Sequence, residues 1–115
     1  MSIKLAVRDK EGVRIVDVAG RITLGEGSST LRNTVREMVT LGDKKILLNF
    51  ADVSYIDSSG IGELVGGFAT VANHGGQLKL VNLPSRVESL LQITKLCTIF
   101  EVFDNEGAAI RSFDN

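Results

Sequence analysis

Hydrophobic and polar residues alternate at the start of the chain, over two short runs. Apolar side chains fill every second position over residues 3–7 and recur from 13 to 18, and a charged turn ending in Gly12 separates the runs. A period of two is typical of strands, so two such runs around a short turn predict an N-terminal β-hairpin. A loop then follows over residues 20–28.

From residue 28 onward, segments with helical spacing alternate with short apolar runs. Residues that recur every three or four positions share one side of a helix. They are Leu31, Val35, Met38 and Val39, then Ile61, Leu64, Val65, Phe68 and Ala72, then Val87, Leu90, Leu91 and Thr94, and last Ala109, Ile110 and Phe113. The apolar runs at 46–50, 78–81 and 99–103 predict strands, and the first, being continuously apolar, is expected to be covered on both faces.

The predicted order of elements is ββαβαβαβα. Alternation of strands and helices indicates an α/β fold with a mixed, mostly parallel sheet of four to five strands and about four helices. The 115 residues fit a single domain over residues 1–115. We expect Pro84 near the first turn of the third helix and Asp104 as the cap of the last helix. The strand at 46–50 is expected to end in a polar turn before Asp57.

Composition and charge argue against two classes of function, nucleic-acid binding and membrane insertion. The net charge of −1 and the pI of about 5.8 argue against nucleic-acid binding. Residues 1–50 hold nine Lys/Arg and six Asp/Glu, and residues 51–115 hold four and eight. The acidic second half is either ordinary surface variation or a face that steers a basic partner. Without a signal-like start or a run of about 20 apolar residues, we expect a cytoplasmic protein that does not insert into membranes. Cys97, among apolar neighbours, is interpreted as a core residue.

Catalytic chemistry finds little support in the sequence. His74 is the only histidine, and it follows a predicted helix about four turns from Ser58 and Ser59, too far to activate either hydroxyl. Residues 60–62 read Gly-Ile-Gly, but Val65 stands where a dinucleotide fingerprint needs its third glycine. No Cys/His cluster has metal-ligand spacing. We therefore expect no catalytic residue, no metal and no cofactor.

The segment from Asp57 to Gly60 is the most informative part of the chain. It joins a predicted strand to a predicted helix, and Asp57 or Ser58 is the expected helix cap. Free N–H groups at a helix start favour negative charge, so the segment either holds a phosphate or only caps the helix. A serine beside the cap would present its hydroxyl to a kinase, and phosphorylation would add about −1.5 to −2 charges there.

Two glycines, Gly66 and Gly67, lie inside the same predicted helix. Glycine costs about 1 kcal/mol relative to alanine in a helix interior, so a specific use is expected. One interpretation is close packing against a neighbouring helix. The other is a smooth surface that a partner protein covers.

Several segments together resemble a known family. They are the N-terminal hairpin with Gly20, the apolar strand at 46–50, Asp-Ser-Ser-Gly-Ile-Gly at 57–62, Gly-Gly-Gln-Leu-Lys-Leu-Val-Asn at 75–82 and the helix at 84–95. This pattern is similar to the STAS domain, and within it to the stand-alone anti-sigma factor antagonists of bacteria. The resemblance covers nearly the whole chain.

The resemblance implies a cycle of partner switching that regulates transcription. The unphosphorylated antagonist binds an anti-sigma factor that is also a serine kinase, and this frees the sigma factor. The kinase then phosphorylates the second hydroxyl of the motif, Ser59, with Ser58 as the alternative site, and a serine phosphatase resets the cycle. ATP and Mg²⁺ belong to the kinase. The implied partner-binding residues are Asp57, Ser58, Gly60, Ile61, Gly62 and Glu63.

One departure and three alternatives stay open. Thr23 stands in the loop where many antagonists carry an acidic residue, and Glu26 comes a little later. This leaves open which kinase fits and whether the loop makes contacts. One alternative is a STAS adaptor without a switch, such as a subunit of a lipid-transport ABC complex. Another is a small-molecule or nucleotide sensor. An exposed hydrophobic helix face would also allow a homodimer.

Overall fold

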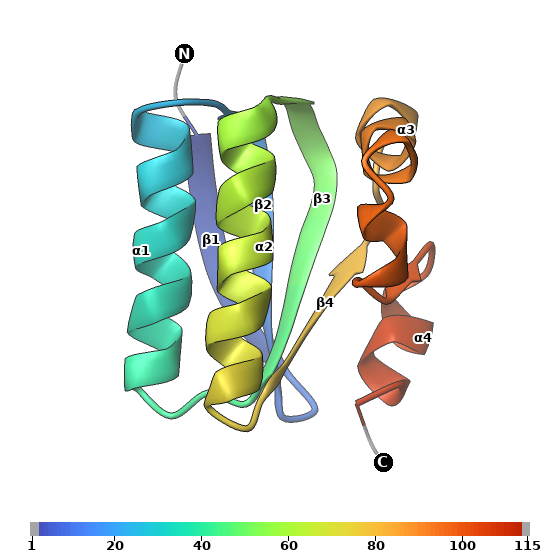
Figure 1. Cartoon of the computed structure of the whole chain (residues 1–115). Coiled ribbons are helices and arrows are strands. Elements are labelled where there is room, and N and C mark those ends of the chain that lie inside the picture. The colour runs from blue at the N-terminus through green and yellow to red at the C-terminus, as the bar shows by residue number, and fades with distance from the viewer. Residues whose placement is uncertain (1–2, 114–115) are drawn as a thin grey trace.

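A mixed five-stranded sheet forms the centre of the computed structural model, which describes residues 3–113 (Figure 1). The strands lie in chain order across the sheet, and only the first pair is antiparallel. Their bounds are β1 (Ile3–Lys10), β2 (Val13–Ile22), β3 (Lys45–Ile56), β4 (Gln77–Val81) and β5 (Val102–Phe103). The expected hairpin and the mostly parallel sheet are confirmed.

Helices cover both faces of this sheet. They are α1 (Glu26–Thr40), α2 (Ser58–Asn73), α3 (Ser85–Ile93) and α4 (Glu106–Arg111), and a 3₁₀ turn at Leu96–Thr98 precedes β5. The first two lie side by side and run in the same direction (Figure 1). Together with α3 they enclose the main core, while α4 packs on a smaller core at the opposite face. The predicted order ββαβαβαβα is confirmed.

The start of β3 is buried from both sides, as its unbroken apolar run predicts. Ile46 and Leu48 face the main core, and Leu47 faces the smaller core beneath α4. All three side chains are fully buried. This strand therefore anchors both layers of helices and fixes the start of α2 directly beyond its end.

The polar turn expected after residue 50 is wrong, because β3 continues to Ile56. The long β2 runs parallel to it and pairs as far as Ile22, which lies beside Ile56. Two register shifts interrupt this pairing and blur the alternation of polar and apolar residues. Tertiary pairing thus makes a strand of a segment whose local sequence is typical of a turn.

Three local predictions near the C-terminus are also wrong. The last strand contains only Val102–Phe103, because Phe100 turns into the main core instead of extending the strand. Cys97 is exposed, since the 3₁₀ turn directs it away from the core. The cap of α4 is Asn105, not Asp104, and its side-chain oxygen accepts a hydrogen bond from the N–H of Ala108 at 2.9 Å. Pro84 precedes α3 as its N-cap residue.

A polar cluster ties α4 to the strands beneath it. The Arg8 guanidinium donates to Asp17 at 2.7 and 3.0 Å and to Glu106, in the first turn of α4, at 2.6 and 3.1 Å. Asn49 adds a hydrogen bond to Asp17 at 2.8 Å. The hydrogen bonds from Arg8 are the main reason that the pKa values of Asp17 and Glu106 lie below their ordinary values. Within the described residues, no helix is both long and apolar enough to cross a membrane.

Candidate functional site

Asp57 caps α2 and links it to a distant loop. One carboxylate oxygen accepts the N–H of Gly60 at 2.9 Å, and the other accepts the N–H of Leu24, in the β2–α1 loop, at 3.0 Å. The N–H groups of Gly60 and Leu24 lower the pKa of Asp57 because they stabilise the charged carboxylate. The prediction that Asp57 or Ser58 caps this helix is confirmed for Asp57.

The two serines follow the cap at the first positions of the helix. Ser58 is exposed and Ser59 is half-buried. Neither hydroxyl has a hydrogen-bond partner among residues 3–113, so neither is engaged by another side chain or by the backbone. A free hydroxyl at a helix N-terminus is set in a local field that favours negative charge. The arrangement can therefore accept an anionic group without loss of an existing side-chain bond.

Gly60 holds the start of α2 tightly against the end of β2. A Cβ atom on Gly60 would overlap the carbonyl oxygen of Ile22 and would lie 2.6 Å from Cγ1 of Ile56. Gly27, at the start of α1, meets the same strand end, and a Cβ there would lie 2.6 Å from the carbonyl oxygen of Arg21. Two helices thus begin in close contact with one strand end, which fixes the loops around the serines.

The other predicted partner-binding residues divide between the core and the surface. Ile61 is buried and anchors the helix in the main core. Gly62 is exposed, with open space where a side chain would stand. Glu63 forms an ion pair with Arg32 of α1 at 2.8 Å. Of the predicted set, Ser58 and Gly62 are therefore exposed, Asp57 and Glu63 are half-buried, and Ile61 is buried.

The two glycines inside α2 lie in different surroundings. A Cβ on Gly67 would lie 3.5 Å from Val35 of α1, at ordinary packing distance, so this glycine faces the neighbouring helix. Gly66 is exposed and has nothing within 4 Å of its Cβ position. Gly62 and Gly66, four residues apart, leave the outer surface of α2 smooth.

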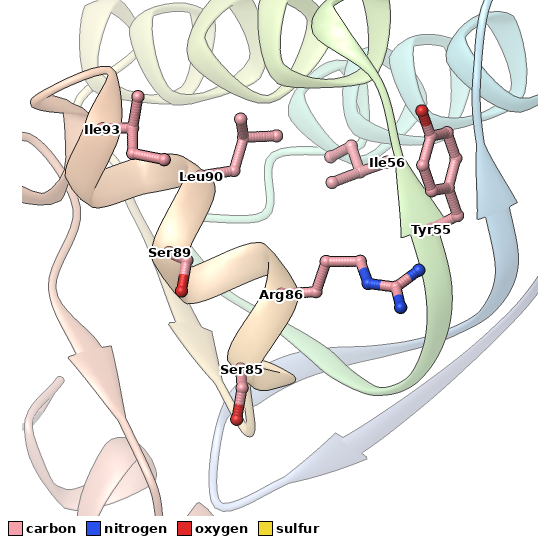
Figure 2. Close-up of a pocket in the computed structure, with 7 residues that line it drawn as sticks. All are labelled: Tyr55, Ile56, Ser85, Arg86, Ser89, Leu90 and Ile93. Carbon is pink, nitrogen blue, oxygen red and sulfur yellow. The ribbon is translucent and has the colours of Figure 1, made fainter.

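The structure has a groove beside the start of α2 that the sequence did not predict. It has a volume of about 550 Å³ and lies between the end of β3 and α3. Figure 2 shows Arg86 extending from α3 toward Tyr55, with Ile56 and Leu90 on either side of the gap. Ile93, at the rim, is 77% exposed. Residues about 30 or more positions apart form the two sides of this groove, and no sequence motif marks it.

His74 lies at the opposite end of α2 from the serines. It is the exposed C-cap residue, and its Nδ1 lies 2.8 Å from the carbonyl oxygen of Thr70. This position supports the interpretation of His74 as a helix-end residue and removes it from the serine site. Among residues 3–113, no group of three or more His, Cys, Asp or Glu side chains is arranged to hold a metal ion.

The order of strands, the two layers of helices and a capped helix beginning directly after the central strand together define a STAS-type α/β domain. The family model described as the STAS domain matches residues 4–109, and the chain belongs to this family. The predicted resemblance is therefore confirmed.

The most informative relatives carry names from transcription regulation. The anti-sigma-B factor antagonist of Bacillus subtilis is 38% identical over 103 residues, which cover 89% of this chain and 92% of that protein. An anti-sigma factor antagonist from Mycobacterium paratuberculosis has the same fold, with a TM-score of 0.88, 19% identity and coverage of 99% and 96%. The Bacillus cell fate determinant SpoIIAA in its phosphorylated form superposes with a TM-score of 0.72, 19% identity and coverage of 95% and 99%.

Proposed function

We propose that this chain is an anti-sigma factor antagonist whose binding to an anti-sigma factor serine kinase is switched off by phosphorylation of Ser59. The observation that carries the proposal is the pair of free serine hydroxyls at the start of α2, beside a cap fixed by Asp57. Relatives that match most of the chain and are named anti-sigma factor antagonists support the partner class. A serine phosphatase would restore the binding form, and the cycle would operate in the cytoplasm.

Charge explains how one phosphate would release the partner. A phosphoserine brings about −1.5 to −2 charges, and Asp57 and Glu63 already place two carboxylates near Ser59. In the free protein water solvates the new dianion and the helix dipole favours it. In a complex, the docked surface would remove that water, and an uncompensated buried charge costs several kcal/mol. About 4 kcal/mol corresponds to a factor of about 1000 in affinity.

The proposed contact surface includes the exposed part of α2 and the groove beside it. The exposed Ser58, Gly62 and Gly66 supply a smooth path along the helix. The groove adds apolar area at its rim and one guanidinium group, that of Arg86. A second guanidinium, that of Arg21, lies outside the lining and stacks 4.6 Å over the ring of Tyr55, which is part of the lining. Within residues 3–113 neither arginine forms an ion pair. The groove therefore suits a segment of the anti-sigma factor with apolar side chains and a carboxylate.

The test begins with the histidine-kinase-like ATPase encoded nearest to this chain in its genome. Purified protein is incubated with that kinase, Mg²⁺ and ATP, and its intact mass is measured. We expect a gain of one phosphate that is lost in Ser59→Ala and kept in Ser58→Ala. Loss in Ser58→Ala alone would move the site by one residue.

Binding of the same kinase to unphosphorylatable and charged variants tests the switch itself. Ser59→Ala should bind permanently, whereas Ser59→Asp should bind much more weakly. Equal affinities of the two variants would contradict the switch and favour an adaptor that docks through the same helix without phosphate.

A further inference from the structure

The two parallel helices α1 and α2 meet in a fixed register. Arg32 of α1 donates from Nη1 to Oε2 of Glu63 at 2.8 Å, and one turn further along, Val35 lies beside Gly67. Because both helices run in the same direction (Figure 1), one turn back from this ion pair leads to Ser29 on α1 and to Ser59 on α2. The ion pair is thus one helical turn from the proposed phosphorylation site.

The side chain of Arg32 extends toward that earlier turn. Its second terminal nitrogen, Nη2, lies 3.5 Å from Oγ of Ser29. Ser59 and Glu63 are four residues apart on α2, so their Cβ atoms are about 5–6 Å apart on one side of the helix. A guanidinium that reaches Glu63 while pointing toward the N-terminal ends of the helices is therefore within reach of an anionic group on Ser59.

Among the charged residues of β2, α1 and the start of α2 at this end of the molecule, Arg32 is the suitable counter-ion. Asp57 and Glu63 would repel a phosphate, and Glu26, exposed in the first turn of α1, adds a third carboxylate. Arg21, at the end of β2, is stacked on Tyr55. Arg36 belongs to the next turn of α1, further from Ser59 than Arg32 is, and lines the small groove around Gly66.

We propose that Arg32 is the phosphate ligand of this site: when Ser59 carries a phosphoryl group, the Arg32 guanidinium leaves Glu63 and binds the phosphoryl oxygens. The proposal rests on Ser59 as the modified residue. A dianion attracts a guanidinium more strongly than a single carboxylate does, and the planar fork of arginine matches two phosphoryl oxygens. The exchange also frees the Glu63 carboxylate on the surface that the partner would cover.

The test uses phosphoserine installed at position 59 during translation, so that it depends on no kinase. The second pKa of the phosphoryl group, about 6 for free phosphoserine, is measured by ³¹P NMR. A nearby cation favours the dianion and lowers this pKa. We expect the pKa to be about 0.5–1 unit lower in the otherwise unchanged protein than in Arg32→Gln. Arg36→Gln is the matched control and should leave the pKa unchanged.

A double-mutant cycle separates this exchange from a general change in charge. Glu63→Gln should lower the phosphoserine pKa when Arg32 is present, because it removes a repelling carboxylate and a competitor for the guanidinium. In the Arg32→Gln background the same substitution should lower it by clearly less. Equal pKa values with and without Arg32 would overturn the proposal. Since no partner is needed, that result would leave the proposed kinase switch intact, and a failed kinase switch would not alter this titration.

Discussion

The carboxylate of Asp57 accepts the backbone N–H of Leu24 at 3.0 Å, across 33 positions of sequence. The same carboxylate caps α2 through Gly60, so a single side chain holds both loops that border the serines. A carboxylate has two acceptor oxygens, whereas an amide has only one. Asparagine caps helices about as well as aspartate. The two roles of Asp57 can therefore be separated by substitution.

Asp57→Asn should keep the helix and loosen the loop. Its single oxygen can still accept the N–H of Gly60, but its NH₂ group would then face the N–H of Leu24. We expect faster amide hydrogen exchange at Leu24 with little change at residues 60–64, whereas Asp57→Ala should speed exchange at both. Unchanged exchange at Leu24 in the asparagine variant would show that this hydrogen bond does not hold the loop.

Gly60 and Gly62 form a matched pair for testing how tightly α2 is seated. Gly60→Ala places a methyl group against the carbonyl oxygen of Ile22 and should destabilise the protein by about 1–3 kcal/mol. Gly62→Ala meets only open space inside a helix and should stabilise it by up to about 1 kcal/mol. Urea unfolding curves measure both. Similar changes in the free energy of unfolding for the two substitutions would mean that the start of α2 can shift to accommodate a methyl group.

Because of Arg8, we expect the free energy of unfolding to depend on pH in the acid range. Asp17 and Glu106 have pKa values below their ordinary ones, mainly because of Arg8, so their contribution is complete above those ordinary values. It is lost as the pH falls through the lowered values. Arg8→Met should cost only about 1 kcal/mol at pH 7, since these ion pairs are partly exposed to solvent. The free energy of unfolding of Arg8→Met should also fall less steeply as the pH drops from above the ordinary carboxyl pKa values through the lowered ones. A slope equal to that of the unchanged protein would contradict this account.

The groove can be tested with two exposed apolar residues at different places. Ile93→Ser, at the groove rim, should weaken binding of the kinase partner about tenfold, or about 1.4 kcal/mol. Leu41→Ser is the control, because Leu41 is 69% exposed at the end of α1, away from the serines. Titration calorimetry measures both affinities. Equal affinities would exclude the groove from the contact surface.

The sequence predicts what depends on local chemistry. Alternating and helical spacings are enough for the order of elements, and the preference of aspartate for a helix cap is enough for Asp57. The segment 51–56 was not predictable as strand, because its pairing with β2 comes from another part of the chain. Cys97 follows the same rule in reverse, since its apolar neighbours indicate burial but the 3₁₀ turn exposes it.

The candidate site shows the same division. The serines, the cap and the helix are adjacent in sequence and were predicted together. The contacts of Asp57 with Leu24 and of Glu63 with Arg32 join residues more than 30 positions apart, so only the folded chain reveals them. Which serine a kinase modifies stays a prediction.

Gly27 and Gly60 each lie tightly against the end of β2, and this has a consequence for how the sequences of such domains can diverge. Backbone atoms of β2 and the buried side chains of Ile22 and Ile56 make these contacts, so the two helix starts keep their positions whatever side chains occupy the exposed places nearby. Relatives can therefore exchange residues at Leu24, Ser58 or Gly62 and acquire a different binding preference on an unchanged frame. Duplicated copies in one cell could be insulated from each other's regulators by a few surface substitutions.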